Sequence, residues 1–251
     1  MNAAEVVEQT ALPILVFGRG WMSHPDTAAR GQKLGLEPPF GFWILGRAGF
    51  LGDVPADVAA AAIGFMHRDR VAGAWDACPD GLPRPEVTNA YAAAATDWGS
   101  EALADIDSAR LTRLDELGRK VARAASPSLG TLFSGWRSAV EAPGDPGGKA
   151  TLTLNVLREL RAGAHLIAVQ AVGIGPHGAI MASEPPRGGE GWAETFGWTV
   201  PHPTPQADKR AEAEALTSSL VVPAYSALEG SELGELVDLV VEAVTTALPE
   251  G

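Results

Sequence analysis

The 251-residue chain carries 31 acidic and 19 basic side chains, a net charge of −12, and 46% of its residues are hydrophobic. A chain of this size and apolar content can bury a real core, which excludes global disorder, and its acidic balance disfavours DNA and anionic membranes as partners. The single Cys78 excludes an intrachain disulfide framework and a cysteine-rich metal site.

The N-terminal segment has no basic region and only a short apolar run, unlike a signal peptide. No stretch of the chain approaches the roughly 18 apolar residues of a membrane span. We therefore expect a cytoplasmic protein without a membrane partner.

The N-terminal half is predicted to be helical. A short glycine-rich helix is expected at 41–52, and a second begins at Asp53 as N-cap and runs to about residue 77, with a break at Gly64. Helices over 85–106 and 107–126 follow. In the latter, an apolar stripe recurs at three- and four-residue spacing, formed by Leu111, Leu114, Leu117 and Val121.

The clearest boundary is Glu141–Ala150, where two prolines and three glycines forbid a continuous helix. We expect an N-terminal helical domain at 1–141, a linker at 142–149, and a C-terminal helical domain at 150–251.

The C-terminal half is also predicted to be helical. A helix from residue 151 either ends at Gly163 or continues unbroken, and another runs from 208 to Pro223. A helix at 231–248, with Ser231 as N-cap, has one apolar face formed by Leu233, Leu236, Val237, Val240 and Val244. Strand signals are scarce, and only 196–200 could form one arm of a small ribbon.

Four polar residues lie close together in the otherwise apolar segment 157–173. On an unbroken helix, Arg158, Arg161 and His165 fall within about a 60° sector, with Glu159 beside them. His165 could act as general acid or base near neutral pH, and an arginine could stabilise negative charge. Glu159 could either set the tautomer of His165 or pair with an arginine. The alternative is a structural network of ion pairs between helices.

His67, at the edge of an apolar face, is a second candidate for proton transfer. Its alternative is a half-buried histidine bonded to backbone. Aromatic side chains, among them Phe42, Trp43 and Phe65, could line a ligand pocket or belong to the core. The sequence contains no phosphate loop, dinucleotide fingerprint, nucleophile elbow or zinc motif. We therefore expect neither a cofactor nor a metal.

Two stretches resemble a large actinobacterial family classed as helix-turn-helix-like. Residues 38–71 are similar to the family's aromatic and glycine pattern at Gly41, Phe42, Trp43, Arg47, Gly52, Phe65 and His67. The second stretch is similar at Arg158, Glu159, Arg161 and His165. The C-terminal end resembles the helix after the wing in MarR-type winged-helix regulators. The resemblance implies a mainly α fold with a winged-helix-like C-terminal half, adds Arg47 to the ligand-binding candidates, and carries no common activity.

The chain departs from that family where the recognition helix would lie. Residues 185–206 are interrupted by glycine and proline, and only Arg187 is a fixed positive charge there. A recognition helix must present polar and cationic side chains to bases and phosphates. We expect a degenerate winged helix that retains the fold and has lost DNA reading.

Two functions from different classes follow. The first is a cofactor-independent enzyme that performs acid–base chemistry on a small apolar or aromatic molecule, in secondary metabolism as the actinobacterial resemblance implies. The second is a MarR-like ligand sensor without catalysis, which would dimerise through the C-terminal helices and show a basic face at Arg187, Lys209 and Arg210. A scaffold without a ligand is a third alternative.

Overall fold

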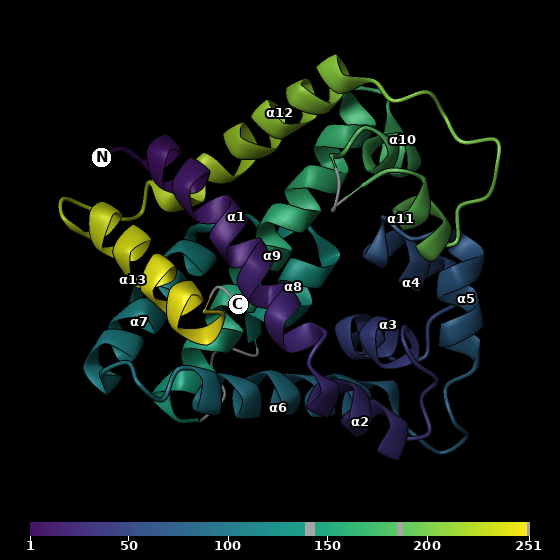
Figure 1. The fold of residues 1–251 in the computed structure, drawn as a ribbon, viewed down its shortest axis with the longest axis horizontal. Coiled ribbons are helices and arrows are strands. Elements are labelled where there is room, and N and C mark those ends of the chain that lie inside the picture. The colour runs from purple at the N-terminus through teal and green to yellow at the C-terminus, as the bar shows by residue number, and fades with distance from the viewer. Residues whose placement is uncertain (139–143, 185–187, 250–251) are drawn as a thin grey trace.

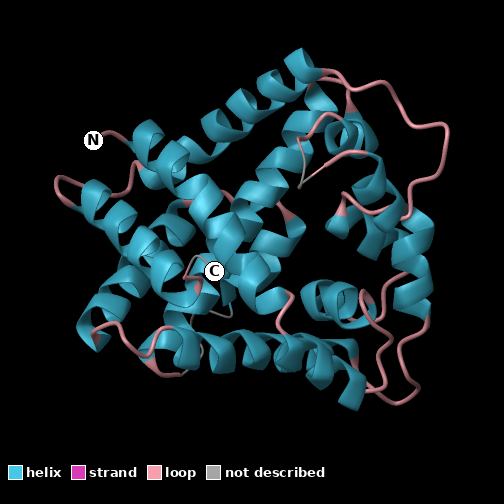
Figure 2. Ribbon diagram, in the orientation of Figure 1, coloured by secondary structure: helices cyan, strands magenta, loops and turns pink. Residues whose placement is uncertain are grey.

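The computed structural model describes residues 1–138, 144–184 and 188–249, and within these ranges it is built from helices and loops without a strand (Figure 2). The mainly α fold class is thus confirmed. The helices, in chain order, are α1 Ala3–Met22, α2 Pro25–Lys33, α3 Gly41–Ala48, η1 Gly49–Leu51, α4 Ala56–Ile63, α5 Arg68–Asp76, α6 Arg84–Ala102, α7 Ser108–Ala124, η2 Pro127–Leu129, α8 Thr131–Trp136, α9 Pro146–Ala171, α10 Gly175–Met181, α11 Glu190–Thr195, α12 Ala207–Tyr225 and α13 Glu232–Ala247.

Helix α9 is the central element, and α1, α6, α7, α8, α10 and α12 all pack against it (Figure 1). At its start, Asp145 caps the helix by accepting hydrogen bonds from the backbone of Gly147 and Gly148 at 2.9 and 3.1 Å. The helix continues through Gly163, so the alternative in which this glycine ends the helix is wrong. Gly163 instead allows close packing, because a Cβ there would lie 2.2 Å from the carbonyl oxygen of Leu129.

For the helix expected to begin at Asp53, the predicted start is wrong and the predicted break is confirmed. Asp53 is not the N-cap: Pro55 precedes α4, and the Asp53 carboxylate instead forms an ion pair with Arg84. The chain does break at Gly64, whose φ of 78° lies in the left-handed region that favours glycine. Helix α5 then begins after His67, whose Nδ1 accepts a hydrogen bond from the backbone of Asp69 at 3.3 Å.

The ribbon arm expected at 196–200 is also wrong. Phe196 and Gly197 form a turn after α11, and none of the described residues, 198–200 included, forms a strand. The Trp198 backbone donates to the oxygen of Ala193 at 2.9 Å, and its indole donates to the oxygen of Phe65 at 2.9 Å. The polar groups of Trp198 therefore form hydrogen bonds at the end of α11 and with Phe65, and do not pair with a second strand.

The C-terminal helices pack within the chain. The expected apolar face of α13 is confirmed, since Leu236 and Val240 are fully buried and Leu233 and Val244 are half-buried against the same core. Ser231 occupies the N-cap position of α13 without a side-chain capping bond. Helix α12 runs through Pro223 to Tyr225, beyond the expected end.

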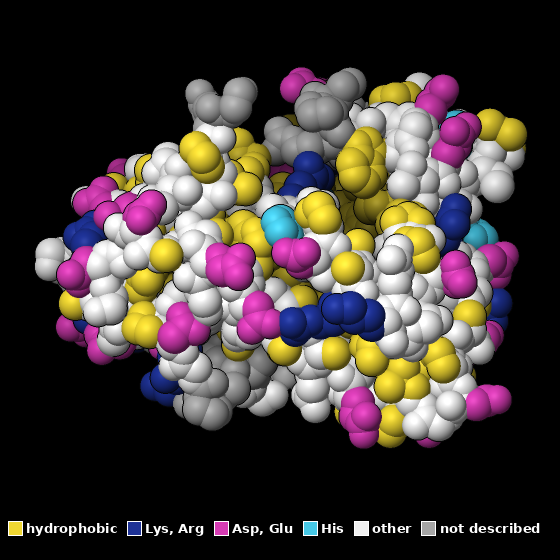
Figure 3. Space-filling model, turned by 60° about the horizontal axis from the view of Figure 1, so that its bottom comes forward, with side chains coloured by type: hydrophobic (Ala, Val, Ile, Leu, Met, Phe, Trp, Pro, Cys, Tyr) yellow, Lys and Arg dark blue, Asp and Glu magenta, His cyan; other side chains and the backbone are white. Residues whose placement is uncertain are grey.

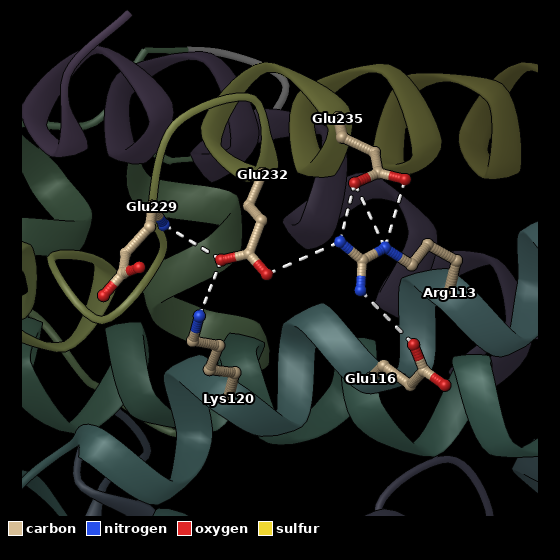
Figure 4. Close-up of polar contacts among 6 residues, drawn as sticks. All are labelled: Arg113, Glu116, Lys120, Glu229, Glu232 and Glu235. Atoms are coloured by element: carbon tan, nitrogen blue, oxygen red, sulfur yellow. Dashed lines mark hydrogen bonds and ion pairs between the residues drawn. The ribbon is translucent and has the colours of Figure 1, made fainter.

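Ionic contacts join α13 to α7 at the surface. The Arg113 guanidinium donates to Glu235 at 2.9 Å, and the Lys120 ammonium donates to Glu232 at 2.6 Å (Figure 4). Glu232 also accepts from the backbone of Glu229 at 2.9 Å. These contacts hold the outer face of α13, while its apolar face joins the core.

The largest buried apolar cluster contains residues from both sides of the expected linker, from Val6 to Ala243. Helix α9 already begins at Pro146, inside the range expected for the linker, and residues 139–143 lie outside the described part of the chain. The division into two domains stays a prediction.

None of the helices described is by itself long and apolar enough to cross a membrane. Only α9 and α10 taken together have the required length and composition, and they are bent by 101° at their junction.

Candidate functional site

A cavity of about 770 Å³ lies between α9 and the helices around it. Its wall includes residues of α1, α3, α4, α10, α11 and α12, and most of the lining side chains are apolar or aromatic. The space-filling view shows a recess in the surface with a hydrophobic floor and a cationic side chain at its edge (Figure 3). A cavity of this size and lining is typical of a site for a small organic molecule.

Three charged residues form an inner group on the cavity wall. The Arg47 guanidinium of α3 donates two hydrogen bonds to the Glu159 carboxylate of α9, at 2.9 and 2.8 Å, and Arg158 donates a third at 2.9 Å. The Glu159 side chain is fully buried, and those of Arg47 and Arg158 are 5% and 13% exposed. Arg47 also lies over the ring of Trp43, 4.2 Å from its centroid.

The charges of the inner group depend on each other. Burial alone would raise the pKa of Glu159, but the neighbouring positive charges and hydrogen bonds of Arg47 and Arg158 lower it below its ordinary value. Burial lowers the pKa of Arg158, and Glu159 opposes that shift. One carboxylate is thus shared between two buried guanidinium groups.

A second, more exposed group joins α9 to α12. Arg161 donates to Glu214 at 2.6 Å, and Arg210 forms an ion pair with the other carboxylate oxygen of Glu214. Arg210 also donates to the Ser183 hydroxyl at 3.2 Å. The side chains of Arg161, Arg210 and Glu214 are 27%, 21% and 41% exposed, so solvent screens this outer group more than the inner one.

His165 lies on the wall one helical turn beyond Arg161. Thr217 donates its only hydroxyl proton to the carbonyl of Ala213 at 2.6 Å, so it accepts in its 2.8 Å contact with His165 Nδ1. The proton of the neutral imidazole is therefore on Nδ1, and Nε2 carries the lone pair. The ring stacks on Phe65, with centroids 5.5 Å apart.

The pKa of His165 is lowered to about 4, chiefly by burial. Glu214 opposes this shift, and the charges of Arg210 and Arg161 add to it. His165 is therefore neutral at pH 7, and its pKa lies below the near-neutral range expected from the sequence. In that state Nε2 can accept a hydrogen bond or a proton.

The structure brings most of the candidate residues together. Those on the cavity wall are Trp43, Arg47, Phe65, Arg158, Glu159, Arg161 and His165. Phe42 lies instead in the core, where its ring contacts that of Tyr91 at 4.9 Å. His67 caps α5 and is not among the lining residues; its ring meets the edge of Trp198 at 5.1 Å.

Sequence reasoning missed two features, the partners that α12 supplies to α9 and a pair of histidines. Arg210, Glu214 and Thr217 give no local signal, because they reach α9 from a helix about 50 residues away in the chain. A pair formed by His177 Nε2 and His202 Nδ1, 3.0 Å apart, stacks on Trp198 through His177. Burial and the charges of the neighbouring histidines lower the pKa of His177. Among the described residues, no group of three or more histidine, cysteine or acidic side chains could hold a metal ion.

Fold and site together define an all-helical protein built around an apolar cavity with arginine-rich polar groups. The chain belongs to the helix-turn-helix family, whose family model matches residues 19–209. The match includes the inner group and His165, and ends just before Arg210. Comparisons with curated proteins and with solved structures give no match.

Proposed function

We propose that the chain binds a small apolar or aromatic molecule in this cavity and acts on it as a cofactor-independent acid–base enzyme. Cyclisation, isomerisation and hydrolysis are reactions that such a site can promote, in secondary metabolism if the actinobacterial resemblance holds. The observation that carries the proposal is the placement of His165: its imidazole lies on the cavity wall, with Nδ1 2.8 Å from the Thr217 hydroxyl.

The chemistry would divide between the histidine and the arginines. His165 Nε2 would take a proton from the bound molecule, and the negative charge that develops would be stabilised by Arg161 or Arg158. Glu159 would hold Arg47 and Arg158 in place through its three hydrogen bonds. Trp43 and Phe65 would contact the apolar body of the ligand.

The decisive variant is His165→Asn, because an asparagine amide can still donate to Thr217 but has no basic nitrogen at the Nε2 position. The native cell extract would be incubated with each protein, and the metabolites consumed or formed would be identified by mass spectrometry. We expect the His165→Asn variant to fold normally by circular dichroism and to lose turnover by about 100-fold or more.

His24→Asn is the matched control. His24 accepts from the backbone amide of Asp26 at 3.3 Å and caps the exposed start of α2. Asparagine caps helices well, so this control should keep both fold and turnover. Unchanged turnover in a folded His165→Asn variant would remove His165 from the reaction.

A ligand-responsive regulator is the second candidate, favoured by membership of the helix-turn-helix family. The DNA-reading parts are weak: α11 has only six residues, carries Glu190 and Glu194, and has no basic residue. Arg210, expected on a basic face, instead pairs with Glu214 at the cavity, and Arg187 lies outside the described residues. A dimer in solution that shifts its own promoter DNA at sub-micromolar concentration would favour the regulator.

A further inference from the structure

The cavity wall has a charge opposite to that of the whole chain. Among the described residues, its charged lining comprises five arginines (Arg19, Arg47, Arg158, Arg161 and Arg210) and two glutamates, which gives a net charge of +3 in a chain of −12. The described lining contains no lysine and no aspartate. The remaining wall is largely apolar, so these cations are concentrated where a ligand would lose its water.

Of the two ionic groups on the wall, the inner group has less access to water. With two guanidinium groups and one carboxylate, it carries one positive charge that nothing within the group balances. Arg47 uses two donors on Glu159, so this pair is neutral as a unit. The unbalanced charge is therefore that of Arg158, which contributes only one hydrogen bond to Glu159.

Arg158 also has unused hydrogen-bonding capacity. Its Nε is buried and has no hydrogen-bond partner among the described residues. A buried donor without a partner and a buried charge without a counter-charge are both unfavourable. A guanidinium group binds a planar anion well, because it offers parallel N–H donors to two oxygens.

We propose that the natural ligand is an amphipathic organic anion with a single negative charge, such as a carboxylate, whose charged group binds Arg158 and whose apolar body lies along the aromatic wall. This inference rests on the proposed function and names its substrate class. One negative charge on the ligand balances the one excess positive charge of the inner group, in which Arg47 and Arg158 share Glu159. The aromatic rings of Trp43 and Phe65 supply the apolar surface.

The distance between Arg158 and His165 sets the length of such a ligand. Residues 158 and 165 are seven positions apart on the unbroken helix α9, a rise of about 10 Å. A molecule whose anionic end meets Arg158 and whose hydroxyl or amine group meets His165 must span roughly that length. The outer group of Arg161, Arg210 and Glu214 lies beside this second end.

The test uses two fluorescent probes with the same aromatic body. One is 1-anilinonaphthalene-8-sulfonate, an anion, and the other is N-phenyl-1-naphthylamine, which lacks the sulfonate. Both are titrated into the full-length protein at the same ionic strength. We expect the anion to bind more tightly by about tenfold or more, the usual effect of a charge-assisted hydrogen bond.

Three variants connect that preference to Arg158. In Arg158→Met and Arg158→Gln the preference for the anion should disappear while the neutral probe binds as before; Arg158→Lys, which keeps the charge, should retain most of it. Arg158→Met leaves the Arg47–Glu159 pair intact, and the glutamine variant offers a polar replacement should methionine disturb the fold. Arg113→Met, at the surface between α7 and α13, is the control and should change neither affinity.

The outcomes separate the two proposals. If both probes bind equally to the wild-type protein, the anion class is wrong and the proposal of a small-molecule site stands. If neither probe binds, both proposals fail. If the anion is preferred but the Arg158 variants keep that preference, the anion binds elsewhere and the assignment to the inner group is overturned.

Discussion

Glu159→Gln should be among the most destabilising single substitutions at the cavity wall. The change keeps the size of the side chain and removes the charge that Arg47 and Arg158 share through three hydrogen bonds of 2.8 to 2.9 Å. Two guanidinium groups, only 5% and 13% exposed, would then face each other without a counter-charge.

The size of the effect follows from that burial. Removing one partner of a buried ion pair costs about 3–5 kcal/mol, because the remaining charge stays desolvated and unpaired. For a chain of this length each kcal/mol lowers the melting temperature by about 2–4 °C, so we expect a fall of about 10 °C. Differential scanning calorimetry and urea unfolding would measure it.

Two comparisons check the reasoning. Glu235→Gln removes a carboxylate that also accepts from an arginine, but at the surface, and should leave the melting temperature nearly unchanged (Figure 4). Adding Arg158→Met to Glu159→Gln removes one of the two stranded charges and should recover part of the loss. A Glu159→Gln protein that melts like the wild type would refute the shared buried charge.

Three further outcomes are expected. The pKa of His165 is lowered to about 4 from 6.5, so the unfolded chain takes up a proton first as the pH falls. Urea unfolding should therefore show that this group makes the protein about 2 kcal/mol less stable at pH 5 than at pH 7. The His165→Asn variant should not show this loss. Gly163→Ala should destabilise the protein in thermal melts, because its Cβ would meet the Leu129 oxygen at 2.2 Å; Gly73→Ala, exposed on α5 with open space around it, should instead stabilise by up to about 1 kcal/mol. In gel-shift assays at physiological salt we expect no specific binding to duplex DNA, because the chain is acidic and α11 has no basic residue; a salt-sensitive shift at sub-micromolar concentration would contradict this.

Local patterns predicted the parts of the fold that depend on local physics. The apolar stripes of α7 and α13 and the break at Gly64 follow from helical periodicity and from the conformational freedom of glycine. The sequence left open whether α9 ends at Gly163 or continues, because the backbone of residues 129–130, which packs against this glycine, comes from a distant part of the chain.

The site residues that lie on α9 could be predicted from the sequence, whereas their partners on other helices could not. Arg158, Glu159, Arg161 and His165 lie together because one helix carries them at neighbouring turns. Their partners on α12 are set by tertiary packing, and no spacing in the sequence indicates that the Thr217 hydroxyl meets His165. The lowered pKa of His165 is likewise a result of burial by other helices.

A small anion that approaches this molecule first meets repulsion. With +3 on the cavity wall and −12 in total, the rest of the chain carries −15. Like charges slow diffusional encounter, and salt screens that repulsion over about 8 Å at physiological ionic strength. Added salt should therefore speed the association of an anionic ligand, the opposite of the behaviour of a protein whose exterior attracts its ligand. Contacts inside the cavity are screened less, so residence times should change little, and the exterior would hold large polyanions away while small ones reach the interior.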